Sequence, residues 1–150
     1  MVLAKDIMTP KPITLESSTS IKEAVEIFSA KKFSSVPVTT SMGEIAGQLT
    51  ELALVRALVL HQIQPEKYKQ LVHCLEMLEE AFFVAPTDSV TTIIKTILKS
   101  PSRRVLVKSD GRQILGIISP KDMLKFLTSG DPTAKSLQAE IGQLGDKKVG

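Results

Sequence analysis

Two stretches decide the fold, Ile45-Ala46-Gly47-Gln48-Leu49-Thr50 and Ile114-Leu115-Gly116-Ile117-Ile118-Ser119. Each begins with an apolar residue, has glycine third and ends on a hydroxyl, and Gly47 and Gly116 are 69 residues apart. An internal repeat constrains architecture more firmly than local propensity does, so the chain is two tandem copies of one unit. Positions upstream recur at the same offset without a gap: Ser20 and Ser89, Val25 and Ile94, Phe28 and Ile97, Val36 and Val105, Val38 and Val107.

The first part of each copy predicts a short strand followed by a helix. Residues 12–15 and 82–84 are extended apolar runs closed by turn-forming residues. Ser20 and Glu23 have the spacing of a capping box, in which a hydroxyl and a carboxylate satisfy free amides at a helix start. In the second copy Asp88 or Ser89 takes the capping position.

The second part of each copy predicts a hairpin followed by a second helix. In the first copy a β-branched run at 35–38 leads to a turn at 41–43 and a partner strand at 44–49. In the second copy the run is at 104–107, the turn at 109–111 and the partner strand at 113–118. Each partner strand ends at a hydroxyl residue that can cap the next helix. Each copy therefore predicts the order β-α-β-β-α, in an α/β (α+β) fold class.

We place the first unit at 1–64, the second unit with its preceding helix at 65–128, and a flexible tail at 129–150. Between the copies the chain is mostly helical in pattern, with Pro65 separating two helices. Glu79 and Glu80 have the pattern of a solvated turn. In the tail, Leu137, Ile141 and Leu144 have the spacing of one short amphipathic helix.

Composition and charge are those of an ordinary globular protein. Of 150 residues, 43% are hydrophobic and 23% charged, which excludes the disordered class. A net charge of +3 on a mixed surface does not indicate nucleic acid as a partner. No apolar run is long enough to cross a membrane, no signal peptide is visible, and Cys74 is the single cysteine. We therefore expect a cytoplasmic protein.

Three motifs then carry a family resemblance: Asp6–Pro10, Ser34–Val38 and Gly116–Asp122. With the repeat, they make residues 1–128 resemble the cystathionine-β-synthase (CBS) domain family, whose members occur as tandem pairs called Bateman modules. The resemblance implies that the two units pack through their sheets with pseudo-twofold symmetry and leave two clefts. It also implies that such pairs commonly form a homodimer.

The resemblance further implies an adenosine nucleotide site at Ser119 and Asp122, with the hydroxyl on phosphate and the carboxylate on the ribose hydroxyls. The physical chemistry agrees with these roles. A helix start presents free N–H groups and a positive dipole to an anion, and a carboxylate can accept two hydrogen bonds from a diol. In the first copy Thr50 keeps the hydroxyl, but Ala53 stands at the carboxylate position. We therefore expect one well-formed nucleotide site per chain and a second, degenerate cleft at Thr50.

Further ligand contacts are expected around this site. Arg103 and Arg104 precede a strand where the family places residues beside the ligand, and guanidinium groups suit phosphate; the alternative is a solvated charge pair. Lys121, at the helix start, is a further candidate to bind the phosphate. The resemblance places adenine contacts near three residues, mostly through their backbone: Phe83, Val84 and Pro86.

No catalytic or metal-ligating set stands out, because His61, His73 and Cys74 have no partners at ligand spacing. We expect no enzyme activity and no obligatory cofactor. Two hypotheses remain. One is a stand-alone regulatory protein that binds AMP, ADP or ATP, with S-adenosylmethionine as a further candidate, and signals to an unknown, separate protein. The other is a ligand-free dimerisation or scaffold module.

Overall fold

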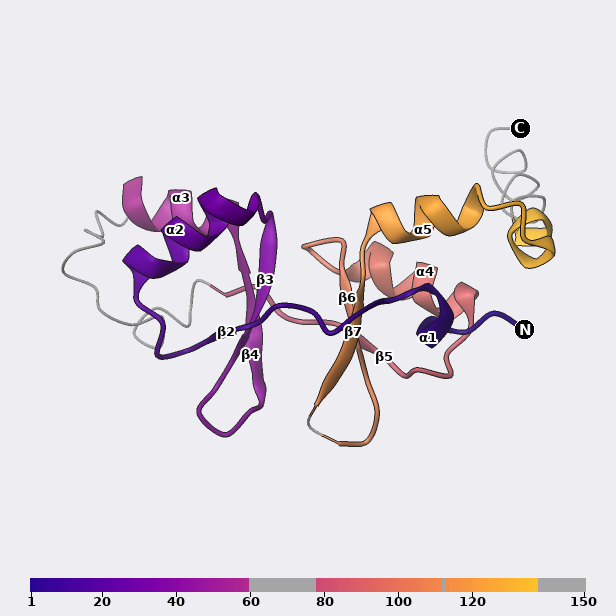
Figure 1. Ribbon diagram of the computed structural model, residues 1–150, viewed down its shortest axis with the longest axis horizontal. Coiled ribbons are helices and arrows are strands. Elements are labelled where there is room, and N and C mark those ends of the chain that lie inside the picture. Colours follow the sequence, from indigo (N-terminus) through magenta and orange to yellow (C-terminus); the bar gives the residue numbers. More distant parts are fainter. Residues whose placement is uncertain (60–77, 112, 138–150) are drawn as a thin grey trace.

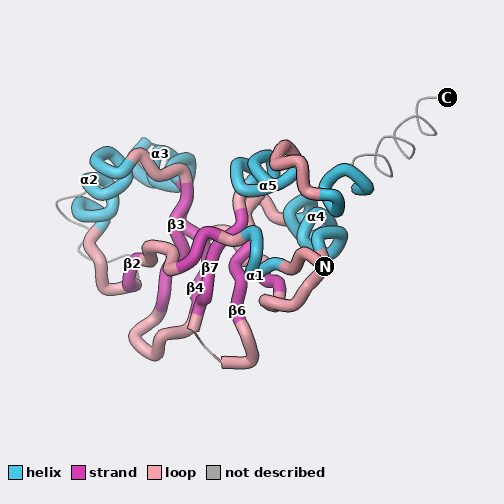
Figure 2. The backbone as a smooth tube through the Cα atoms, turned by 45° about the vertical axis from the view of Figure 1, so that its right-hand side comes forward, coloured by secondary structure: helices cyan, strands magenta, loops and turns pink. Residues whose placement is uncertain are grey.

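The computed structural model describes residues 1–59, 78–111 and 113–137, and these form two similar halves side by side. Figure 1 shows the strands of both halves near the middle of the molecule, with α2 and α3 over one half and α4 and α5 over the other. The turned view in Figure 2 shows the same arrangement. The α+β class and the packing of two repeated units are therefore confirmed.

The first half has the predicted order of elements. These are β2 (Leu15–Glu16), α2 (Ile21–Lys31), β3 (Ser35–Thr39), β4 (Ile45–Thr50) and α3 (Glu51–Val59). Strand β3 lies between β2, to which it is parallel, and β4, to which it is antiparallel. Helix α2 begins where predicted, because the Ser20 hydroxyl accepts a hydrogen bond from the Glu23 N–H at 3.0 Å.

The second half repeats this order. Its elements are β5 (Phe83–Val84), α4 (Val90–Lys99), β6 (Val105–Lys108), β7 (Ile114–Ile118) and α5 (Pro120–Leu127). Of the two predicted caps for α4, Ser89 takes the role and accepts from the Thr92 N–H, whereas the Asp88 carboxylate accepts from the Ala85 N–H.

The sheet of each half also pairs with the segment that precedes the other half. Helix α1 (Ala4–Ile7) and strand β1 (Thr9–Pro10) lie on the second half, where β1 pairs with β7, and the chain then crosses to β2 (Figure 1). In the same way Glu79 pairs with Gln48 on β4. Both repeated glycines permit this exchange. A Cβ on Gly116 would lie 2.9 Å from the Thr9 carbonyl oxygen, and one on Gly47 would lie 2.8 Å from that of Glu79.

Apolar residues on one face of each sheet form two separate cores under the helices. Val36 and Val38 belong to the first core, and Val105 and Val107 belong to the second. Because side chains alternate along a strand, Pro37 and Leu106 point to the opposite faces, yet both are fully buried. Those faces are therefore covered by the other half, as expected for two units packed through their sheets.

The segments outside the two units are described only in part. Residues 132–137 are helical, Ala134 is buried, and Leu137 packs against the second core. The other predicted helix positions in the tail, Ile141 and Leu144, lie outside the described residues, as does most of the predicted helical region between the copies. No helix in the described ranges is long and apolar enough to cross a membrane.

Candidate functional site

The first turn of α5 carries the two residues predicted to hold the nucleotide. Ser119 is the N-cap and Pro120 the first helical residue, so the local sequence favours a helix start here. The Ser119 Oγ accepts from the Asp122 N–H at 3.3 Å, and Asp122 Oδ2 accepts from the Ser119 N–H at 2.8 Å. This capping box holds the hydroxyl and the carboxylate side by side, with Ser119 Oγ 3.0 Å from Asp122 Oδ2.

Thr9 is a further member of this cluster that the sequence analysis did not single out. Its hydroxyl donates to Asp122 Oδ1 at 2.9 Å, across 113 residues of chain. Pairing of β1 with β7 places it there, because Thr9 lies opposite Ile117. Its position within the Asp6–Pro10 motif was the signal that could have identified it. The Thr9 hydroxyl therefore occupies one of the two acceptor positions of Asp122 Oδ1, where it would compete with a ligand hydroxyl.

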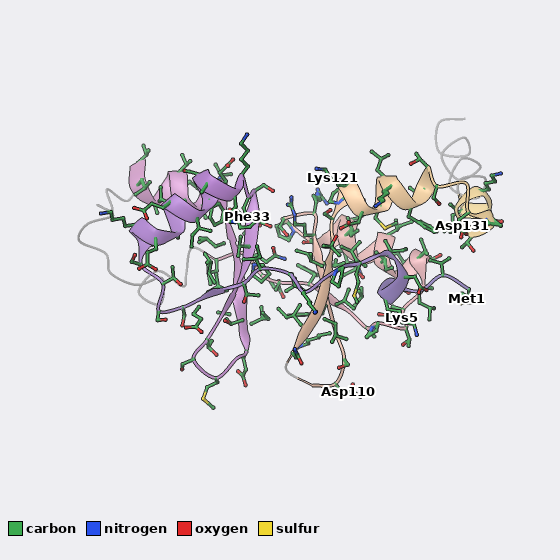
Figure 3. The ribbon with its side chains drawn as sticks, viewed as in Figure 1. Met1, Lys5, Phe33, Asp110, Lys121 and Asp131 are labelled. Carbon is green, nitrogen blue, oxygen red and sulfur yellow. The ribbon has the colours of Figure 1, made fainter. Side chains whose placement is uncertain are left out.

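The predicted basic residues divide among three places. Lys121 is exposed in the first turn of α5, at the boundary between the halves (Figure 3). Arg103 has a φ of 58° and donates from its guanidinium to the Leu98 carbonyl near the end of α4. Arg104 donates to the Ser102 carbonyl at 3.2 Å and to the Ser34 hydroxyl of the first half.

Of the predicted adenine contacts, Phe83 and Val84 form β5 and Pro86 follows it. This edge strand is the one farthest from β1, since the sheet order is β1-β7-β6-β5. Val84 packs in the second core, and the Pro86 carbonyl accepts from the Lys5 N–H at 3.0 Å. Phe83 is half-buried, with the Lys108 Nζ 4.2 Å from its ring centroid. The structure therefore brings Ser119, Lys121 and Asp122 together. It places the predicted adenine contacts at the other edge of the sheet.

A cavity of about 290 Å³ lies at the first copy's cleft. Thr50 lines it and also caps α3, accepting from the Ala53 N–H at 3.0 Å. Arg104, which the sequence analysis grouped with Ser119, lines this cavity together with Thr50. The full lining comes from both halves: Ser34, Ser35, Thr50, Glu51, Leu52, Glu79, Pro101, Ser102 and Arg104.

Glu79 lines this cavity and Gln48 bonds to Ser35 in its wall, and each has one buried polar atom without a hydrogen-bond partner. Gln48 is fully buried, and its side-chain oxygen accepts from the Ser35 hydroxyl at 3.0 Å, but its Nε2 is unpaired. The Oε2 of Glu79 is also buried and unpaired. The expectation that Glu79 lies in a solvated turn was therefore wrong, because its main chain pairs with β4 and turns the side chain inward.

The family model of the CBS domain matches this chain twice, at residues 4–60 and 72–129. The chain belongs to the CBS domain family. Among curated relatives of this CBS pair, "Uncharacterized protein MJ1225" of Methanocaldococcus jannaschii is 26% identical over 125 residues, which is 83% of this chain and 42% of the relative. The chain thus spans less than half the length of that relative.

Solved structures of CBS pairs share the fold. CBSX2 of Arabidopsis thaliana in complex with AMP has a TM-score of 0.68 at 19% identity, covering 84% of this chain and 96% of that one. The CBS domain pair of MJ0100 in complex with 5′-methylthioadenosine and S-adenosyl-L-methionine has a TM-score of 0.68 at 22% identity, covering 87% and 99%. At these identities the likeness shows the fold alone.

No group of three or more His, Cys, Asp or Glu side chains within the described ranges is placed to hold a metal ion. The residues considered for metal or thiol chemistry, His61, His73 and Cys74, lie outside those ranges.

Proposed function

We propose that this CBS pair is a regulatory module of the cytoplasm, without enzyme activity, that binds an adenosine nucleotide of the AMP, ADP or ATP class between its halves. The observation that carries the proposal is the capping box at the start of α5. It fixes a hydroxyl and a carboxylate next to each other, where a phosphate and a ribose diol would need them.

The start of α5 suits the phosphate. The first turn of a helix is the positive end of its dipole, which favours an anion. In α5 the Asp122 N–H already donates to Ser119 Oγ and Pro120 has no N–H, so the dipole and the side chains supply the attraction. In this proposal the Ser119 hydroxyl turns from Asp122 Oδ2, to which it donates in the ligand-free protein, and donates to the phosphate. Lys121 adds a positive charge from the same turn. Asp122 accepts hydrogen bonds from the ribose hydroxyls in place of the one from Thr9.

The family supports this class of ligand. AMP is bound by CBSX2, and two adenosine-containing ligands are bound by the CBS pair of MJ0100. The adenosine group is the part common to all three. In the proposal, ligand binding changes how the halves or a homodimer pack, and a separate protein responds to that change.

A second candidate, a ligand-free dimerisation or scaffold module, is favoured by one observation. Leu52, Val55 and Val59 on α3 are all more than half exposed. An apolar row of this kind is suited to contact a second copy. It requires no ligand, so nucleotide binding separates the two candidates.

The test is calorimetric titration and thermal unfolding of the wild type, Asp122→Asn and Asp122→Ala with AMP, ADP, ATP and S-adenosylmethionine, and GMP as a control. Ligand at 100 times its dissociation constant stabilises a protein by about 2.7 kcal/mol, here a rise of roughly 5–10 °C. Each variant is compared with its own ligand-free transition, because Asp122 also caps α5.

Asp110→Ala is the matched control, since Asp110 is an exposed carboxylate at the tip of the β6–β7 hairpin, far from α5 (Figure 3). The proposal predicts a rise with an adenosine ligand in the wild type and in Asp110→Ala, reduced in both Asp122 variants. If no adenosine ligand binds the folded wild type, the nucleotide proposal fails and the scaffold candidate stands.

A further inference from the structure

One hydrogen bond ties the N-terminal segment to the start of α5. Thr9 on β1 donates to Asp122 Oδ1 at 2.9 Å, across 113 residues of chain. The other carboxylate oxygen, Oδ2, accepts from the N–H and the hydroxyl of Ser119. A ribose carries two neighbouring hydroxyls, so a diol bound by both carboxylate oxygens brings one donor to the place beside Oδ1 where the Thr9 hydroxyl stands.

The first half shows that such a tie is not needed to hold an incoming segment on its sheet. Glu79 takes the place of Thr9 there and pairs with Gln48 on β4. Their two main-chain hydrogen bonds are 2.8 and 2.9 Å long. Ala53 stands at the position of Asp122, so the start of α3 offers no carboxylate at this position. Main-chain pairing is enough for the fold, and the Thr9–Asp122 bond is therefore available for another role.

Strand β1 is weakly held apart from this bond. It has two residues, both exposed, and it lies at the edge of its sheet. The next residue, Lys11, donates its N–H to the Leu115 carbonyl at 3.2 Å, but its φ of 51° is a conformation that residues with a side chain rarely adopt. Helix α1 is held more firmly, because Ala4 is fully buried and its N–H donates to the Asp88 carbonyl at 2.9 Å. Movement is therefore expected in β1 and the residues after it, and not in α1.

The crossing segment, residues 11–14, leads from β1 to the first half and has room to move (Figure 1). Residues 12–14 make no main-chain hydrogen bond to any other residue that the structure describes. A hollow of about 350 Å³ is lined by this segment and by both hairpins, among others by Pro12, Gly43 and Gln113. The chain then enters β2, where Leu15 is buried in the first core. A shift of the crossing segment therefore acts directly on the first half.

We propose that the Thr9–Asp122 hydrogen bond is a latch that the nucleotide opens. The inference rests on the proposed function, since it requires an adenosine ligand at Asp122, and it adds how binding there is transmitted. When a ribose hydroxyl donates to Oδ1, Thr9 loses its acceptor and β1 loosens from β7. Lys11 can then leave its disfavoured conformation. The crossing segment shifts over the hollow, and the packing of the first half against the second changes.

Amide hydrogen exchange of the full chain, followed by NMR with and without AMP, tests the inference. Saturating AMP is expected to make the Lys11 amide exchange roughly fivefold faster, the factor that corresponds to the loss of one exposed hydrogen bond. The Ala4 amide in α1, which is bonded to the Asp88 carbonyl, is the internal reference, and its exchange should stay unchanged.

Three variants separate a latch from a merely structural contact. Thr9→Val lacks the hydroxyl, so it should show the faster Lys11 exchange without AMP and no further change with it. Thr9→Ser keeps the hydroxyl and should respond to AMP as the wild type does. Thr91→Val is the matched control, since Thr91 is an exposed threonine on α4, and it should also respond as the wild type does.

The outcomes distinguish this inference from the proposed function. If AMP shifts the Asp122 amide signal while Lys11 exchange stays unchanged or slows, the inference is wrong and the proposed function stands. The inference is also wrong if Thr9→Val responds to AMP as the wild type does. If AMP changes neither the Asp122 signal nor the Lys11 exchange in well-folded protein, both fail.

Discussion

Replacing Thr9 with valine tests how the ligand-free protein holds Asp122. Valine keeps the shape of threonine and the main-chain pairing of β1 with β7, and it removes only the hydroxyl that donates to Asp122 Oδ1. Hydrogen bonds to charged groups contribute about 1.5–3 kcal/mol, and this one is exposed, so about 1 kcal/mol is a reasonable figure. In the proposed complex the ribose hydroxyls displace this bond, so the nucleotide binds against that cost.

Thr9→Val is therefore expected to bind AMP roughly fivefold more tightly than the wild type. AMP no longer has to break the Thr9 bond, and about 1 kcal/mol at an RT of about 0.59 kcal/mol is a factor of about five in the dissociation constant. The ligand-free variant should unfold about 2–4 °C lower, since it loses the same bond. Titration calorimetry measures the first effect and differential scanning calorimetry the second. Thr91→Val, an exposed threonine on α4, is the control. Unchanged or weaker AMP binding in Thr9→Val would refute the reasoning.

Two further predictions concern the stability of the paired halves. Gly116→Ala should lower the free energy of unfolding by about 1–3 kcal/mol in urea titrations, because the new Cβ meets Met8 and the Thr9 carbonyl. Gly111→Ala is the control and should leave the free energy of unfolding unchanged, because its new Cβ would meet only the Ser109 Oγ, at 4.0 Å. Equal effects of the two substitutions would show that β1 packing is not the cause. Leu106→Ala should lower the free energy of unfolding by about 2–5 kcal/mol, because the fully buried Leu106 side chain fills the contact between the halves. Leu98→Ala is the control, since Leu98 is exposed. A loss under about 1 kcal/mol for Leu106→Ala would contradict the assignment of that contact.

Much of the fold follows from local pattern and the repeat. The β-α-β-β-α order was predictable because hydroxyl caps such as Ser20 and Ser89 and the glycine-containing hairpin turns are read within a few residues. The capping box of Ser119 and Asp122 is local in the same way. The helix caps at Ser20 and Ser89 and the two hairpins recur at one offset, and this recurrence supported the assignment of two units.

What the sequence did not predict depends on contacts between distant segments. Strand β1 has two residues, and nothing in them indicates that it pairs with β7, so the role of Thr9 stayed hidden. Glu79 stands in a charged pair that is typical of solvated turns, yet its pairing with Gln48 buries a carboxylate oxygen. Arg104 was grouped with Ser119 because the family resemblance places residues before that strand beside the ligand, but its long side chain reaches Ser34 in the other half.

The central claim is that an adenosine nucleotide binds at the start of α5, and amide NMR of the ¹⁵N-labelled protein tests it most directly. On titration with AMP, the account predicts saturable shifts of the Ser119, Lys121 and Asp122 amide signals, absent with GMP and greatly reduced in Asp122→Asn. Amide signals of these three residues that stay in place at millimolar AMP, in a spectrum of well-folded protein, would contradict it.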